Sequence, residues 1–151
     1  MVVTHAVVIG IDNYEDGFGS LKTAVSDAEK FSDYLKNDYD SDADQKNTDV
    51  KLLKDAKKSQ IFDAISSLEG TVNRNDPIIF FFSGFAGQSE TDSEDGEKEG
   101  LLCPADVLKE GGISATSLLN LFDQISRSCG NNIVSIFDAG RTRFNFFYFT
   151  F

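Results

Sequence analysis

The stretch Ile78–Gln88, IIFFFSGFAGQ, decides the fold of this chain. It opens with five consecutive apolar residues, a run too short to span a membrane and too apolar for a strand with one face in water. The run therefore predicts a central strand of a sheet covered on both faces, followed by a tight turn at Ser83 and Gly84. Ligands of open α/β sheets bind beyond the carboxyl ends of the strands. The residue at that place is Phe85, which can neither transfer a proton nor bind a metal.

Apolar runs and helical periods on either side extend this strand into an alternating pattern. We expect further strands at residues 6–11, 49–54 and 132–137, a short extended piece at 101–104, and helices at 21–36, 59–69 and 114–130. Ser20, Ser59 and either Ser114 or Thr116 are suited to cap the three helices. Such alternation implies right-handed crossovers between parallel strands. The predicted fold class is α/β, a three-layer sandwich with a mostly parallel sheet of about four to five strands flanked by helices.

Composition excludes several classes of partner and of site. The 151 residues are enough for one domain, and their formal net charge of −11 argues against nucleic-acid and membrane partners. The two cysteines, Cys103 and Cys129, form no CxxC pair, so we expect neither a disulfide framework nor a zinc site. We see no charged-then-apolar leader and expect a cytoplasmic location.

No cofactor is expected. Residues 89–100 hold six acids and form an exposed loop that offers at most a weak calcium site. Asp40, Asp42 and Asp44 follow the spacing of a calcium loop, but Gln45 replaces its essential glycine, so that motif fails.

The chain has a single histidine, His5, which precedes the first predicted strand. In a parallel sheet this position is at the edge opposite Ser83, so no nucleophile there has an imidazole beside it. The groups left at the carboxyl edge are Asp12, Ser83, Asp138 and, from the first helix, Asp27. These residues could coordinate a hard cation or hold a cationic side chain. The helical period leaves open whether Asp27 faces a cleft or is an ordinary surface acid.

Six segments, in order, carry a resemblance to a known family. They are AVVIGIDNY (6–14), LKTAVSDAEKFSDYL (21–35), VKLLKDAKKSQIFDAISSL (50–68), IIFFFSGFAGQ (78–88), LLCPAD (101–106) and NNIVSIFDAGRTR (131–143). Together they resemble the caspase-like cysteine peptidases, and among these the metacaspase-type domains. The resemblance implies a caspase-like sandwich and a large-subunit domain at residues 1–143. Residues 144–151 would then be an apolar tail.

The resemblance breaks at the family's catalytic dyad. Phe85 stands where the family has its histidine, and Gly140 stands where it has the nucleophilic cysteine. The resemblance therefore implies that both the general base and the nucleophile are lost. The single histidine leads to the same conclusion without the resemblance.

The family's specificity pocket is retained. In metacaspases two aspartates and a serine bind an arginine or lysine of the substrate, and the matching residues here are Asp27, Asp138 and Ser83. Ala24 replaces a cysteine that helps to line that pocket. The resemblance thus implies a catalytically inactive pseudo-peptidase that binds a protein or a basic peptide as a regulatory module. The alternative is a truncated or altered product of an active endopeptidase specific for arginine and lysine.

The tail FNFFYFTF, residues 144–151, contains five phenylalanines and no charge. This composition is typical of an aggregation-prone strand and predicts self-association through the tail. The same residues could dock as an edge strand of the sheet, or could reflect an altered reading frame.

Overall fold

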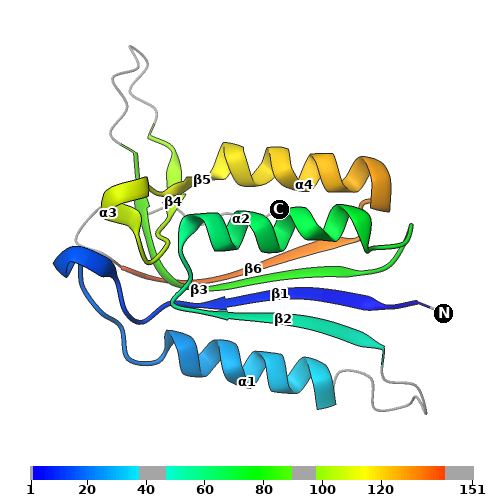
Figure 1. Cartoon of the computed structure of the whole chain (residues 1–151), viewed down its shortest axis with the longest axis horizontal. Helices are drawn as coiled ribbons and strands as arrows, with labels where there is room; N and C mark the ends of the chain where they lie inside the picture. The colour runs from blue at the N-terminus through cyan, green and yellow to red at the C-terminus, as the bar shows by residue number, and fades with distance from the viewer. Residues whose placement is uncertain (1, 38–46, 90–97, 142–151) are drawn as a thin grey trace.

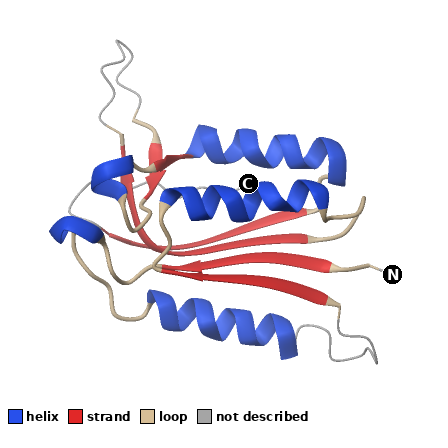
Figure 2. Cartoon of the chain, viewed as in Figure 1, coloured by secondary structure: helices blue, strands red, loops and turns tan. Residues whose placement is uncertain are grey.

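The computed structural model describes residues 2–37, 47–89 and 98–141 of the chain. Its sheet is sandwiched between helices, as Figures 1 and 2 show. In chain order the elements are β1 (Thr4–Gly10), η1 (Glu15–Gly17), α1 (Ala24–Asn37), β2 (Thr48–Lys54), α2 (Lys58–Ser66), η2 (Ser67–Gly70), β3 (Ile78–Gln88), β4 (Gly100–Leu102), α3 (Val107–Glu110), β5 (Ile113–Ser114), α4 (Ala115–Cys129) and β6 (Ile133–Arg141).

The sheet is mostly parallel, as predicted. β1 lies between β2 and β3, β6 pairs with the other side of β3, and all these pairs are parallel. β4 and β5 continue the sheet from the far end of β3 in antiparallel pairs. The described sheet has six strands, more than the expected four to five, because the two-residue β5 gives no apolar run that could be recognised in the sequence.

Each face of the sheet has its own core, because side chains alternate along the strands. α2 and α4 cover one face, where Val7, Ile9, Phe80 and Phe82 are buried. Of the described elements, α1 alone covers the other, over a row of smaller and aromatic residues (Ala6, Val8, Ile79 and Phe81). Figure 1 shows this imbalance of one helix against two. Within the three described ranges, no helix has the length and apolar character needed to cross a membrane.

The prediction of a tight turn at Ser83 and Gly84 is wrong, because β3 continues through both residues to Gln88. A side chain at Gly84 would bring its Cβ within 2.8 Å of the Tyr14 hydroxyl. Glycine thus lets the loop after β1 pack directly on β3. Pairing with β6 continues without interruption here, from Ser83 opposite Asp138 to Ala86 opposite Arg141.

Two predicted helix starts are also wrong, because partners distant in sequence cap these helices. α1 begins at Ala24, whose N–H donates to Asp12 Oδ1 at 2.9 Å, and Ser20 is not its cap. α2 begins at Lys58, before the predicted cap Ser59. Ser114 is confirmed as the cap of α4, since its Oγ accepts the N–H of Ser117 at 3.0 Å.

Candidate functional site

The two positions that the resemblance assigns to a catalytic dyad are neighbours in the sheet. Phe85 on β3 is directly opposite Gly140 on β6, in the parallel register of the two strands. Adjacent strands lie about 4.8 Å apart, so an imidazole and a thiol at these positions would be close enough to interact. The register thus brings these two positions together, and the residues that occupy them have no acid-base or nucleophilic group.

The ring of Phe85 belongs to an aromatic cluster, here called the Phe85 cluster, formed with Tyr14 and Phe18. The ring centroid of Phe85 is 4.9 Å from that of Tyr14 and 5.8 Å from that of Phe18, and Phe85 is only 9% exposed. Its N–H donates to the Tyr14 hydroxyl at 2.7 Å. Burial raises the pKa of Tyr14, although the hydrogen bond from Phe85 opposes this shift. The tyrosine therefore stays neutral. The Phe85 cluster is thus a packed, uncharged group at the position that the resemblance assigns to the general base.

Both cysteines are buried, as expected for structural thiols. The N–H of Cys103 donates to the carbonyl of Phe85 at 2.9 Å, which places this cysteine beside the Phe85 cluster. Burial raises the pKa of Cys103 to about 12, so its thiol is protonated at neutral pH. A protonated thiol is a poor nucleophile, so burial makes Cys103 poorly suited to nucleophilic chemistry.

Ser83 and Asp138 lie side by side at the carboxyl edge of the sheet, as register partners on β3 and β6. Gly10 of β1 is the partner of Ser83 on its other side. A Cβ at Gly10 would come within 2.5 Å of the Ala24 carbonyl, so the first turn of α1 sits directly on this row. Ser83 is buried at 3% exposure, whereas Asp138 is open to solvent.

Asp27 lies on the side of α1 that faces β3. One turn further along the helix, Phe31 stacks on Phe81 of β3 with ring centroids 4.6 Å apart. Residues four apart share a helix face, so Asp27 is on the same side as Phe31 and closer to the carboxyl edge. Glu29 marks the opposite side, because it forms an ion pair with Lys54 at the end of β2. The structure thus places Asp27, Ser83 and Asp138 on one face of the sheet and at one edge.

Asp12, the remaining candidate acid, has a structural role. Its carboxylate caps α1, and its N–H donates to Asp55 Oδ1 at 2.8 Å. Burial opposes the ionisation of Asp55, but hydrogen bonds from Asn13 and Asp12 outweigh it and hold the pKa of Asp55 below its usual value. The sequence could not distinguish this helix cap from a ligand-binding acid.

Comparison with known proteins identifies the family. Residues 4–144 match the family model described as metacaspase, peptidase C14 domain. The chain belongs to this family. No curated protein sequence matches it. Among solved structures, protein GSU0716 from Geobacter sulfurreducens is similar in fold, with a TM-score of 0.68 at 18% sequence identity. The match covers 89% of this chain and 48% of that protein, so the metacaspase-type domain spans about half the length of its structural relative.

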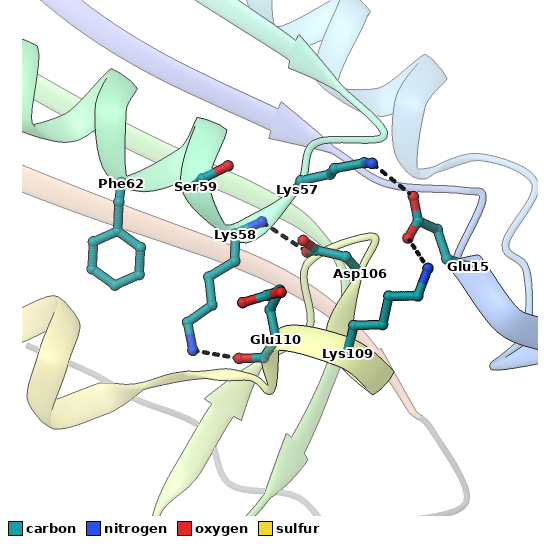
Figure 3. Close-up of a pocket in the computed structure, with 8 residues that line it drawn as sticks. All are labelled: Glu15, Lys57, Lys58, Ser59, Phe62, Asp106, Lys109 and Glu110. Carbon is teal, nitrogen blue, oxygen red and sulfur yellow. Dashed lines mark hydrogen bonds and ion pairs between the residues drawn. The ribbon is translucent and has the colours of Figure 1, made fainter.

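A separate cavity of 530 Å³ lies at the start of α2 in this metacaspase-type domain (Figure 3). Three lysines and three acids line it together with two further residues: Lys57, Lys58, Lys109, Glu15, Asp106, Glu110, Ser59 and Phe62. Glu15 forms ion pairs with two of the lysines, at 3.1 Å from Lys57 Nζ and 3.9 Å from Lys109 Nζ. Lys58 Nζ donates instead to the backbone carbonyl of Glu110 at 2.8 Å. Nothing in the sequence pointed to the cavity, because its residues come from η1, the start of α2 and the region of α3, which no motif connects.

His5 is remote from the candidate site, as predicted. It lies within β1 opposite Ile78, at the amino edge of the sheet. Its Nδ1 is 3.5 Å from Asp49 and its Nε2 is 3.6 Å from Asp76, and the side chain is buried. The histidine is therefore a buried packing residue of that edge, between two carboxylates.

Three expectations fall outside the described residues. The failed calcium-loop motif lies at residues 40–45, the candidate calcium loop at 89–100 includes residues 90–97, and the apolar tail occupies residues 144–151. All three remain predictions from the sequence.

Proposed function

We propose that this metacaspase-type domain is catalytically inactive and acts as a pseudo-peptidase that binds basic peptides or proteins. The observation that carries this proposal is the Phe85 cluster, which fills the place of the family's general base with packed aromatic rings. The buried thiol of Cys103, with its raised pKa, supports the loss of cysteine chemistry.

The bound group is an arginine or lysine side chain held by Asp27, Ser83 and Asp138. The family's pocket residues are present at these positions, and their common face and edge support a shared site. Two carboxylates and a hydroxyl offer acceptors for the donors of a guanidinium or an ammonium group. A domain that keeps this pocket without a dyad would hold a basic residue of its partner without cutting the chain.

Two measurements test the proposal. Peptides with an internal arginine or lysine should remain uncut by the full chain, and cleavage that stops after thiol alkylation would overturn the claim of inactivity.

In calorimetry, acetyl-arginine methylamide should bind, and Asp138→Asn should weaken that binding about tenfold or more, as expected for loss of a charged hydrogen-bonding partner. Asp123→Asn is the matched control, because Asp123 is an exposed acid of α4 paired with Arg127. Equal binding by both variants would contradict the assigned pocket.

A further inference from the structure

The face of the sheet under α1 becomes steadily more exposed toward β6. Along two registered rows, the exposed fractions are 0, 7 and 38% at Val8, Phe81 and Ile136, and 1, 8 and 52% at Ala6, Ile79 and Val134. α1 contacts β1, β2 and β3, and it leaves the side chains of β6 on this face open. We call Val134 and Ile136 the β6 strip. Ile133 and Phe137 point to the opposite face, where they pack against the core under α2 and α4.

The width of the open area matches one more helix. The buried line of α1 lies over β1, because a Cβ at Gly10 would come within 2.7 Å of Ala28 Cβ. β6 is two strands away from β1, with β3 between them. Two strand spacings amount to about 9.6 Å, which matches the distance of about 8–10 Å between the axes of packed helices. A helix over β6 would therefore pack beside α1 as well as on the sheet, as α2 and α4 do on the other face.

The side of α1 that would meet this helix is apolar in the middle and acidic toward the carboxyl edge. Phe31 is half-buried, and its ring stacks on Phe81. Asp27 lies one turn nearer that edge, where Asp138 follows the β6 strip on the same face. Lys30 Nζ is 4.0 Å from Asp27, but both side chains are exposed, and such a pair is weak enough for another base to replace it. An apolar area that ends in two carboxylates fits a ligand that is apolar along its length and basic at its end.

We propose that the β6 strip docks an amphipathic helix of a partner protein. This inference rests on the proposed function, because the basic residue of that helix enters the pocket of Asp27, Ser83 and Asp138. Two residues along β6 span about 6.6 Å, and four residues of a helix span about 6 Å. The partner therefore reads apolar-x-x-x-apolar-x-x-x-basic, with its apolar residues on Val134 and Ile136. The basic residue lies in the last turn of the helix, where the helix dipole also favours it.

Charge complementarity favours this partner over a second copy of the chain. Two copies that met through the β6 strip would bring Asp27 and Asp138 of both together, in a chain with a net charge of −11. A basic helix meets the same acids with attraction. The partner is thus a helical segment with positive charge at its carboxyl end.

The test uses the full chain and labelled helical peptides in fluorescence anisotropy. The probe SAQQLAAQLAAQRAAQ carries two leucines and an arginine in the proposed pattern on a strongly helix-forming background. It should bind about fivefold more tightly than SAQQAAAQAAAQRAAQ, which lacks the leucines. The peptide SAQQLAPQLAAQRAAQ keeps the leucines and the arginine, but its proline breaks the helix, so it should lose that gain. Equal binding by the leucine and alanine peptides would overturn docking on the strip, and full binding by the proline peptide would overturn the helical partner.

Variants of the chain locate the docked helix. Ile136→Lys should abolish the gain from the leucines, because it places a charge on the β6 strip, and Val134→Lys should do the same at the more exposed position. Leu119→Lys is the matched control on α4, where the leucine is also exposed, and should leave the gain intact. A gain that survives both substitutions in the strip would place the peptide elsewhere and overturn the proposal.

The outcomes separate this inference from the proposed function. If acetyl-arginine methylamide binds through Asp138 but the leucines add nothing, helix docking is wrong and the basic pocket stands. If the small ligand fails to bind while the gain from the leucines remains, the basic pocket is wrong, and so is the pattern proposed here.

Thiol labelling of Ile136→Cys identifies any other occupant, because Cys103 and Cys129 are both buried. The introduced thiol should react as fast as that of Leu119→Cys and become protected when the leucine probe is added. Protection that rises with protein concentration would show that a second copy covers the strip. Slow labelling at every concentration would show that the chain's own residues cover it. Either result overturns the proposal.

Discussion

At the scale of single residues, Phe85 is a packing residue that joins the loop after β1 to β3. A catalytic histidine needs contact with water, substrate and its nucleophile, whereas Phe85 is enclosed by Tyr14 and Phe18 from the loop after β1. A Cβ on Gly19 would lie 3.3 Å from the Phe85 ring, so the loop packs closely against the ring edge. The aromatic side chain therefore holds this loop against β3 and is part of the core.

This role predicts a loss of stability when the ring is removed. Phe85→Ala should lower the free energy of unfolding by about 3 kcal/mol, because it deletes a buried aromatic ring and leaves a cavity. Urea denaturation followed by circular dichroism measures the change. Leu108→Ala is the control, since Leu108 is 57% exposed and its truncation should cost no more than about 0.5 kcal/mol. Equal small losses in both variants would mean that the Phe85 ring contributes no packing.

At the scale of elements, the start of α2 depends on a residue almost fifty positions away. The N–H of Lys58 donates to Asp106 Oδ1 at 2.8 Å, and Asp106 is itself buried. The same carboxylate faces the cavity in Figure 3, so it joins the helix cap to the loop that follows β4. This contact holds α2 and α3 in place at the carboxyl end of the sheet.

Loss of this cap should therefore destabilise the whole domain. Asp106→Ala should reduce the free energy of unfolding by about 1–2 kcal/mol, the range found when a capping carboxylate is removed. The readout is the midpoint of urea denaturation at constant slope. Asp63→Ala, at an exposed carboxylate on the same helix, should change the midpoint little. A midpoint for Asp106→Ala that equals the wild-type value would show that water replaces the cap without cost.

At the scale of the whole molecule, the strands could be predicted and the loops could not. The runs that begin near Ala6 and Ile78 are so apolar that only a sheet covered on both faces accommodates them, and the structure confirms both as neighbouring parallel strands. The start of α1 depends on Asp12 and the cap of α2 on Asp106, which no local pattern reveals. The residues of the candidate pocket could be named from the sequence, but their arrangement could be predicted only in part. The side on which Asp27 lies follows only from the stacking of Phe31 on β3.

The net charge of −11 predicts how the domain responds to salt. Excess negative charge destabilises a compact state by self-repulsion, and salt screens that repulsion. Salt also weakens ion pairs such as Lys57–Glu15 and Lys109–Asp16, but exposed pairs contribute only about 0–1 kcal/mol each. Repulsion among eleven unbalanced charges should outweigh these few pairs. We therefore expect the urea midpoint at neutral pH to rise between about 20 and 500 mM sodium chloride.

The same titration at about pH 4.5 is the control, because the carboxyl groups begin to take up protons there and the repulsion shrinks. The salt effect should then be smaller than at neutral pH. A midpoint that falls with salt at neutral pH would mean that the paired charges around η1 and α2 dominate over the net charge. In that case the cavity in Figure 3 would be the main electrostatic support of the fold, and Lys57→Gln should reproduce most of the loss seen at high salt.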